Sequence, residues 1–514
     1  MKQENKLFDK LNIFEICIFL TGTILRILRL SSIPAGVYID EPPISYSAWC
    51  IANYGVDRYL VKMPIYFRNW YSGQSPLYTY LLALLYKLGA PSGNVFVIRF
   101  PACFLGILIP VIVYLIAREI TDYRPAHTFS VLLSSFCPYF FMQGRVGLDC
   151  NLLLFCVTLS FLFLIRYIKR KKPYDLVFCG ISFGLSLYSY ALSYILLAVF
   201  LIFFSLYLLW TKKAKIKEIL IMALIVVLTA LPIILFAICV VFNTGEFSFA
   251  GFTIAPASQG RMAELSFANF FANAARYMKR SLTYDGHFTL TLKEFSTLYY
   301  ISIPFAVAGI ILSFINFAKS IRKKEFHIDT PFFLLYASNI FVGGLNSDIL
   351  SYRINSVFLA YLYFTVKALC LFSECFKKIS IKKVVFCIVA SGYILYAGFF
   401  FKFYFCDYST KYDGFVHSAK DAIDYWQSQN RAGEVYVDYY NLPELVLYEY
   451  PISPYEWSEA ESVLNITPDI PEEIDPDKGY IVRKSNGAVI NKLSDPKYGF
   501  GRKEFEYYVL YHPL

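Results

Sequence analysis

Residues 218–242 read EILIMALIVVLTALPIILFAICVVF, an apolar run in which Glu218 is the single charged residue. A helix needs about 20 largely apolar residues to cross the hydrocarbon core of a bilayer. The run is longer than this, and the segment directly before it, residues 212–217, carries four lysines. The stretch therefore predicts a membrane-spanning helix with a basic flank.

Ten further apolar runs accompany this one along the chain of 514 residues. The eleven lie near 12–30, 96–117, 127–143, 151–168, 175–190, 192–211, 218–242, 297–318, 331–345, 354–373 and 384–404. The composition agrees, since 57% of the residues are hydrophobic and 17% charged, whereas a soluble domain carries about a quarter charged residues. It excludes a cytosolic enzyme, a disordered chain and a nucleic-acid-binding module, and predicts a polytopic α-helical membrane protein with about eleven transmembrane helices.

A twelfth apolar stretch, Ser75 to Ala90, is short and rich in Tyr, which favours a helix lying at the membrane interface in the first outer loop. If this stretch does not cross, the basic clusters at residues 169–172 and 212–217 fall on the side of the Lys-bearing N-terminus. If it crosses, they fall on the opposite side. The positive-inside rule therefore favours eleven spans with a cytoplasmic N-terminus and an extracytoplasmic C-terminus.

The tail differs from the body in charge. From Phe405 to Leu514 there are 19 acidic and 10 basic residues, a net charge of −9, against a net charge of +19 for the preceding residues. We expect a transmembrane catalytic domain over 1–404 and a small extracytoplasmic α/β domain over 405–514. The predicted elements of this tail domain are a helix at His417–Gln429 and strands at Glu434–Tyr440, Tyr480–Lys484 and Phe505–Tyr511.

Two adjacent carboxylates, Asp40 and Glu41, follow the first run in the sequence YIDEPP. Beside an apolar surface, burial raises the pKa of a carboxyl group and makes it a better base near neutral pH. The pair is therefore a candidate general base. An ordinary acidic turn before two prolines is the competing interpretation.

The pattern around the pair resembles the opening of the glycosyltransferase C superfamily, and more narrowly glycosyltransferase family 39, near the protein O-mannosyltransferases and the lipid A aminoarabinose transferases. These multispan enzymes take a sugar from a polyprenyl phosphate. The matching residues are Asp40-Glu41-x4-Tyr46, Tyr54-Gly55-x-Asp57, Met63-Pro64, Ser75-Pro76-Leu77-Tyr78-x-Tyr80 and Arg99-Phe100-Pro101-x4-Gly106.

The resemblance implies roles for individual residues. It makes Asp40 the catalytic carboxylate with Glu41 beside it, and it places Arg145 and Asp149, from the turn QGRVGLDCN, near the donor phosphate and sugar. One departure is the Gln74-Ser75-Pro76 segment, where close relatives often have a Lys or a His-Pro-Pro. A cationic contact to the donor is then absent here or supplied from elsewhere in the chain.

A third candidate is Arg353 in Asn346-Ser347-Asp348-x4-Arg353, between the ninth and tenth runs. A fixed guanidinium holds a phosphate through two parallel hydrogen bonds, and related enzymes also have an Arg here. The competing interpretation is an Arg whose side chain reaches the lipid headgroups.

The resemblance, together with these residues, implies an inverting glycosyltransferase that moves a sugar from a polyprenyl-phosphate donor to an acceptor hydroxyl outside the membrane. Expected partners are the lipid-linked sugar, membrane lipids and a glycan, lipid or protein acceptor, without nucleic acid. No cofactor is expected; a divalent ion is compatible with the chemistry, but no ligand cluster requires one. A lipid-linked glycan transporter and a glycan ligase or polymerase remain alternatives.

Overall fold

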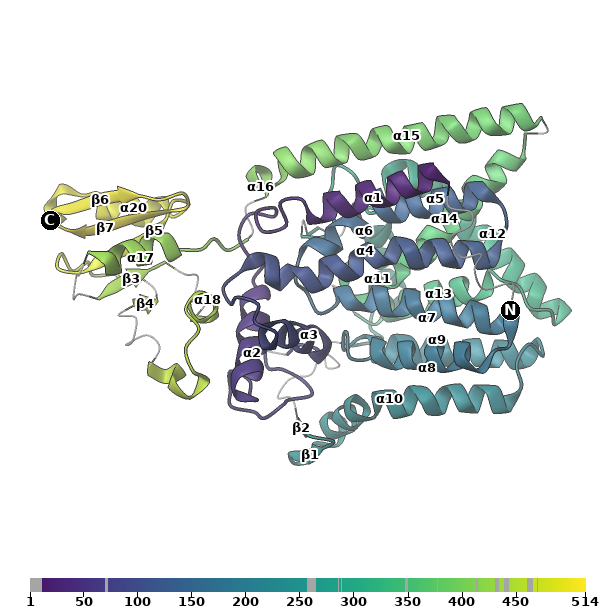
Figure 1. Ribbon diagram of the computed structural model, residues 1–514, viewed down its shortest axis with the longest axis horizontal. Helices are drawn as coiled ribbons and strands as arrows, with labels where there is room; N and C mark the ends of the chain where they lie inside the picture. The colour runs from purple at the N-terminus through teal and green to yellow at the C-terminus, as the bar shows by residue number, and fades with distance from the viewer. Residues whose placement is uncertain are drawn as a thin grey trace. The chain divides into compact units, whose positions relative to one another are not determined.

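The computed structural model describes residues 12–69, 73–256, 265–284, 286–287, 289–346, 350–376, 378–412, 415–429, 434–438, 443–459, 466–468 and 470–514. The chain forms two compact units (Figure 1). Unit 1 contains Met1–Leu30, Ile65–Tyr78 and Arg99–Tyr412, and unit 2 contains Ser31–Pro64, Thr79–Ile98 and Asp413–Leu514. Unit 2 therefore includes two segments of the predicted first outer loop in addition to the tail.

Every predicted apolar run overlaps a helix of the structure. These helices are α1 Ile13–Ile27, α4 Val95–Ile120, α5 Arg124–Phe136, α6 Pro138–Met142, α7 Asn151–Arg170, α8 Pro173–Ser186, α9 Ser193–Trp210, α10 Ile216–Phe242, α12 Ile303–Lys323, α13 Thr330–Gly344, α14 Val357–Glu374 and α15 Ile379–Cys406. Unit 1 also contains the short hairpin β1 Phe247–Phe249 and β2 Phe252–Ile254, and the helix α11 Phe270–Leu282.

Among the described residues, seven helices are long and apolar enough to cross a membrane: α4, α7, α9, α10, α12 with the turn before it, α14 and α15. Helices α1, α5, α8 and α13 are shorter, with 15, 13, 14 and 15 residues. The prediction of a polytopic α-helical membrane protein is confirmed. The exact count of eleven spans stays a prediction.

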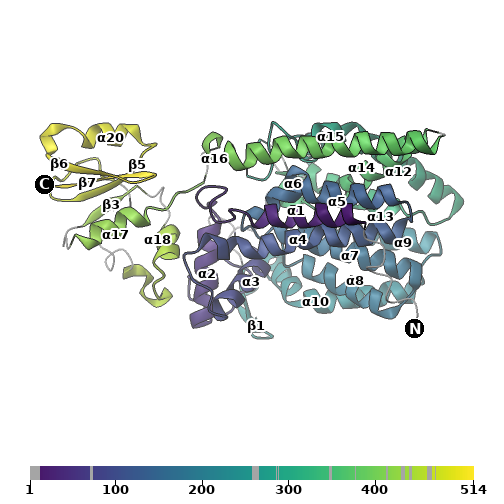
Figure 2. The same ribbon diagram turned by 45° about the horizontal axis from the view of Figure 1, so that its top comes forward.

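The helices of unit 1 run side by side along one direction in both views (Figures 1 and 2). One end of the bundle, which we call the basic end, carries the lysine-rich connections α7–α8 and α9–α10. There Lys171 donates hydrogen bonds to the carbonyl of Lys213 at 2.8 Å and to Glu218 at 2.9 Å. The other end, which we call the site end, carries the connections α6–α7, α8–α9 and α13–α14.

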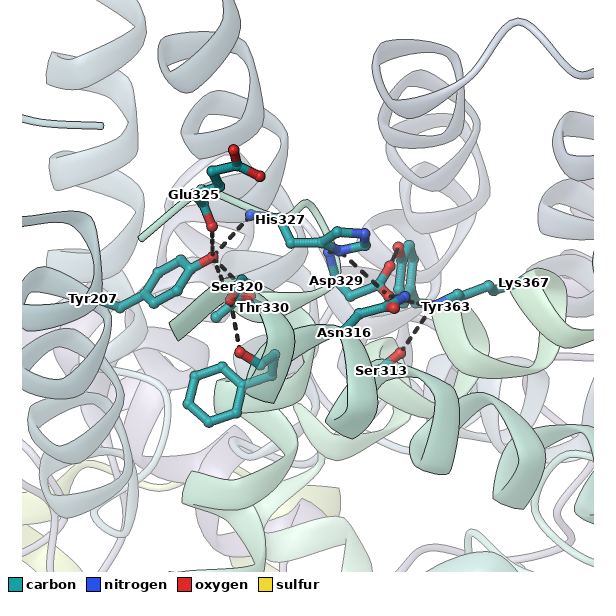
Figure 3. Close-up of polar contacts among 11 residues, drawn as sticks. Tyr207, Ser313, Asn316, Ser320, Glu325, His327, Asp329, Thr330, Tyr363 and Lys367 are labelled. Carbon is teal, nitrogen blue, oxygen red and sulfur yellow. Dashed lines mark hydrogen bonds and ion pairs between the residues drawn. The ribbon is translucent and has the colours of Figure 1, made fainter. Parts of the chain in front are cut away.

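A buried polar network closes the basic end (Figure 3). Asp329, in the connection between α12 and α13, is 1% exposed and forms an ion pair with Lys367 of α14. Its carboxylate also accepts hydrogen bonds from Tyr363 and, at 2.8 Å, from the amide of Asn316. Lys367 lies 3.4 Å from the hydroxyl of Ser313. The network joins α12, α13 and α14, so its charges stabilise the bundle.

Unit 2 contains a five-stranded sheet in the order β4-β3-β5-β7-β6. Strands β3, β4 and β5 are parallel, and β7 pairs antiparallel with β5 and β6. The bounds are β3 Val435–Val437, β4 Ile466–Pro468, β5 Gly479–Arg483, β6 Phe500–Glu504 and β7 Tyr508–Pro513, with helices α17 Lys420–Ser428, α18 Pro443–Glu449 and α20 Gly487–Leu493. The predicted small α/β domain is confirmed, and β4 and β6 are strands that the sequence reasoning missed.

The predicted outer loop adds two helices, α2 Glu41–Tyr54 and α3 Pro76–Lys87. The Ser75 to Ala90 stretch is thus helical as expected. Within unit 2, the Val37 backbone pairs with Val416 through two hydrogen bonds of 2.8 Å, and the Tyr46 hydroxyl donates to the carbonyl of Ile452 at 2.8 Å. These contacts, and the packing of α2 against α18, hold the segment that carries Asp40 to the tail.

Candidate functional site

The two adjacent carboxylates occupy different environments at the start of α2. Glu41 is fully buried, and its carboxylate accepts a hydrogen bond from the Tyr38 N–H at 2.7 Å while its own N–H donates to the Tyr38 carbonyl at 2.8 Å. Asp40 is half-buried, and its carbonyl accepts the Ile44 N–H at 3.3 Å. Glu41 therefore holds the turn, and Asp40 is the carboxylate with the greater access to a substrate.

The buried thiol of Cys50 on α2 is not a competing nucleophile. Burial raises the pKa of the Cys50 thiol to about 12. A thiol becomes a strong nucleophile only as its thiolate, so Cys50 is protonated and unreactive near neutral pH.

Asp149 lies at the site end of unit 1, at the start of α7. Its side chain accepts hydrogen bonds from the backbone N–H of Ser75 at 3.0 Å and of Cys150 at 2.7 Å, and the residue is 8% exposed. The amide of Asn355 donates to the Cys150 carbonyl at 2.8 Å. Three predicted elements therefore meet here: the Gln74-Ser75-Pro76 segment, the Asp149 turn and the segment that carries Arg353.

Arg145, in the same turn, is fully buried. Its guanidinium donates to the carbonyls of Leu25 at 3.1 Å, Arg26 at 2.8 Å and Arg29 at 3.0 Å, and to the hydroxyl of Tyr404 at 3.2 Å. The side chain thus joins the Asp149 turn to α1 and α15. This geometry gives Arg145 a structural role, and its contact with a donor stays a prediction.

Arg353 lies in the 3₁₀ turn Ser351–Ile354 that precedes α14, and its side chain is half-buried between more deeply buried neighbours. Its backbone N–H donates to the Leu350 carbonyl at 3.0 Å. The residues Ser347 and Asp348 of the same predicted motif lie outside the described residues. The turn thus places Arg353 at the site end, two residues before Asn355.

The buried polar atoms at the site end that have no hydrogen-bond partner within the described part of the chain include the Ser75 hydroxyl, the Tyr194 hydroxyl and the amide oxygen of Asn355. Burying a polar atom without a partner costs about 1–3 kcal/mol, so such groups are rare and call for a ligand or water. The sequence reasoning missed Tyr194 and Asn355. Their signal was weak, because each lies among other polar residues at the start of an apolar helix.

Comparison with known families and structures identifies this architecture. Residues 73–238 match the family model described as dolichyl-phosphate-mannose-protein mannosyltransferase. The archaeal oligosaccharyltransferase AglB from Archaeoglobus fulgidus, solved with an inhibitory peptide and a dolichol-phosphate, superposes with a TM-score of 0.54 at 13% identity, over 92% of this chain and 70% of that one. The chain has a glycosyltransferase C-type fold.

A second structure, ArnT from Cupriavidus metallidurans bound to undecaprenyl phosphate, gives a TM-score of 0.52 at 13% identity, over 97% of both chains. Comparison with curated protein sequences gives no match. The resemblance expected from the Asp40 motif is therefore confirmed by a family match and by whole-chain similarity of fold. The matched segment 73–238 contains Ser75, Arg145, Asp149 and Tyr194.

Across the described residues, no three His, Cys, Asp or Glu side chains gather as a metal site. Independence from metal ions stays a prediction.

Proposed function

We propose that the protein is a membrane glycosyltransferase that moves a sugar from a polyprenyl-phosphate donor to an acceptor hydroxyl. The observation that carries this proposal is the site end of unit 1. In the family-matched segment there, Ser75 and Tyr194 have buried hydroxyl groups without a partner among the described residues, and the Asp149 carboxylate accepts the N–H of Ser75. Further support is that structures with the same fold were solved with dolichol-phosphate and undecaprenyl phosphate.

In the proposed reaction, Asp40 takes the proton of the acceptor hydroxyl as its oxygen attacks the anomeric carbon. The bond from that carbon to the phosphate oxygen breaks, and polyprenyl phosphate leaves as the product. Arg353 stabilises the charge on the departing phosphate, as fixed cations do in sites that exclude water. A single displacement of this kind inverts the anomeric configuration.

The remaining predicted residues support these two. Asp149 accepts hydrogen bonds from sugar hydroxyls, and Arg145 fixes the turn that presents Asp149. Glu41 holds the turn that presents Asp40. The reaction needs no cofactor, so activity should persist in excess chelator.

The acceptor is a glycan, a lipid or a protein, and the reaction takes place on the extracytoplasmic face. This orientation follows from the lysines of the basic end, which the positive-inside rule assigns to the cytoplasm. A cysteine introduced at Lys171 should then be shielded from an impermeant thiol reagent in intact cells, and one at Lys497 should be labelled. The exposed native cysteines Cys17, Cys375, Cys387 and Cys406 are first replaced by Ser.

The decisive experiment compares Asp40→Asn with Glu41→Gln. Purified enzyme is incubated with radiolabelled polyprenyl-phosphate sugars, and sugar transfer is measured with and without candidate acceptors. Loss of a general base lowers turnover by about 10²–10⁴-fold, so Asp40→Asn should show this loss with donor binding intact. Glu41→Gln keeps a hydrogen-bond acceptor for Tyr38 and should be milder.

Three outcomes would change the assignment. Near-normal turnover of Asp40→Asn beside an inactive Glu41→Gln would exchange the two roles. Near-normal turnover of both variants would remove the pair from the mechanism. Movement of intact lipid-linked glycan without sugar transfer would favour the transporter.

A further inference from the structure

A groove opens between α9, α12 and α13 at the basic end of unit 1. It has a volume of about 580 Å³, which falls in the range of about 300–1,000 Å³ that is typical of ligand sites. Six of its eight lining residues are purely apolar, and the other two, Tyr207 and Trp210, each carry one polar atom. This lining favours a hydrocarbon chain over a polar molecule.

The groove lies along the last turns of two helices that can cross a membrane, α9 and α12. Its lining on α9 extends from Phe203 to Trp210, roughly 10 Å at a rise of 1.5 Å per residue. One leaflet contributes about half of the hydrocarbon thickness of about 30 Å. Phe203, Leu206 and Trp210 are all more than one-third exposed. The groove therefore faces the acyl chains of a single leaflet.

The polar atoms of the groove wall already have partners within the protein. The Trp210 indole N–H donates to the Ile321 carbonyl at 3.0 Å. The Tyr207 hydroxyl accepts the His327 N–H at 2.8 Å and the Thr330 hydroxyl at 3.1 Å (Figure 3). These bonds fix α9 to α12 and to the connection before α13. The wall thus offers an occupant apolar surface and needs no hydrogen bond from it.

The mouth of the groove is cationic. The Lys324 ammonium lies 5.0 Å from the centre of the Trp210 ring, and the Lys213 ammonium lies 5.6 Å from that of Phe326. The two segments that carry these lysines, residues 211–217 and 319–329, contain eight basic and two acidic residues. One of the two acids, Asp329, is buried and paired with Lys367. A surplus of positive charge therefore borders the end of the groove where lipid headgroups lie.

We propose that this groove is a binding site for an anionic phospholipid, with an acyl chain against α9 and α12 and the headgroup phosphate between Lys213 and Lys324. Basic pockets between membrane helices bind anionic headgroups in this way. A zwitterionic phospholipid would bring its own ammonium group to the lysines, which repel it. The inference does not depend on the proposed function, because the groove lies at the opposite end of unit 1 from the candidate donor site.

The test uses phosphatidylglycerol with a photoreactive group on one acyl chain, added to the purified full-length protein in phosphatidylcholine nanodiscs. Crosslinked peptides should come from Ser193–Trp210 and Ile303–Lys323. Crosslinking should saturate as the fraction of probe rises. Unlabelled phosphatidylglycerol should compete, and additional phosphatidylcholine should not.

Two charge variants test the headgroup contact. A lysine near an anionic lipid surface makes about a fivefold difference in affinity, so Lys213→Gln and Lys324→Gln should each raise the half-saturating fraction of probe by about this factor. Their matched control is Lys383→Gln, because Lys383 is an exposed lysine of α15 outside the groove, and this variant should bind as the wild type does.

A third variant tests the acyl-chain contact. Leu206→Trp places a larger side chain in the groove and should remove the crosslinks to Ser193–Trp210. Its matched control is Leu224→Trp, since both leucines are 57% exposed on candidate spans and Leu224 is outside the groove. The unfolding midpoint of each variant shows whether it is folded.

Three results would overturn the assignment. Equal competition by phosphatidylcholine would identify ordinary lipid contact. Unchanged binding by both charge variants, or crosslinks confined to other helices, would remove the headgroup or the groove from the site. Stronger competition by undecaprenyl phosphate than by phosphatidylglycerol would show that the groove selects a different lipid.

Discussion

The two ends of unit 1 use buried polar groups in opposite ways. At the basic end, the Asp329 carboxylate has a counterion and two hydrogen-bond donors, all from side chains of the protein (Figure 3). At the site end, hydroxyl groups of Ser75 and Tyr194 are equally shielded but lack partners among the described residues. A satisfied network stabilises a fold, whereas an unsatisfied one is available to a ligand.

The same contrast separates Glu41 from Asp40 in unit 2. Glu41 is buried and bound to the Tyr38 backbone, and Asp40 is half-buried at the helix start. Neighbouring carboxylates thus divide into one that holds the structure and one with access to a reactant. If the contrast is correct, substitutions at the basic end of unit 1 should lower stability, and substitutions at the site end should lower activity.

The largest effect on stability is expected for Lys367→Met at the basic end. The substitution leaves the Asp329 carboxylate buried without its counterion, and such a loss costs about 3–5 kcal/mol. Denaturant unfolding in detergent measures it, with Lys402→Met as control because Lys402 is exposed on α15. A cost below about 1 kcal/mol would contradict a stabilising role for the pair.

Arg353→Ala, at the site end, should weaken donor binding and leave the stability of the protein nearly unchanged. Loss of a charge-assisted contact to phosphate costs about 1.5–3 kcal/mol, or roughly one to two orders of magnitude in donor affinity. Unfolding should change little, since Arg353 is half-buried. Lys279→Ala, an exposed position of α11, is the control. Unchanged donor dependence would assign Arg353 to the lipid headgroups.

Acid should weaken the basic end selectively. Burial alone would raise the pKa of Asp329, but Lys367 and the hydrogen bonds from Tyr363 and Asn316 hold that pKa below its usual value. The stabilisation is therefore complete above the unfolded pKa of about 3.9 and is lost as the pH falls through the lower, folded pKa.

The measurement is the difference in unfolding free energy between wild type and Asp329→Asn as the pH is lowered. Other carboxylates are present in both proteins, so their contributions cancel. The difference should shrink in acid, and a constant difference would show that Asp329 is not ionised in the folded protein.

The smallest stability effect is expected for Ser75→Ala, which should change the unfolding free energy by less than about 0.5 kcal/mol because no side-chain hydrogen bond is lost. Its control is Ser281→Ala, equally buried, whose hydroxyl lies 2.9 Å from that of Tyr361 and whose loss should cost about 1–3 kcal/mol. Sugar transfer should be lowered more by Ser75→Ala than by Ser281→Ala. Equal stability losses would show that Ser75 has a partner after all.

Sequence reasoning located the elements well and their partners poorly. Each apolar run coincides with a helix, and the tail strands at Tyr480–Lys484 and Phe505–Tyr511 overlap β5 and β7. It missed β4, which has only three residues, and β6, in which three of the five residues are charged. The resemblance implied that Arg145 lies near the donor phosphate, which stays a prediction, and it gave no sign that carbonyls around α1 and the Tyr404 hydroxyl of α15 accept hydrogen bonds from the Arg145 guanidinium.

The sequence by itself determined the helical membrane body, the charge asymmetry and the Asp40 motif, because apolar length, charge and local motifs are properties of neighbouring residues. Only the tertiary structure decided which polar groups are satisfied. Asp329 meets Lys367 across 38 positions of the chain, and Ser75 meets Asp149 across 74. Whether a buried polar group has a partner depends on how helices pack, and that packing separates the groups that stabilise this protein from those left for a ligand.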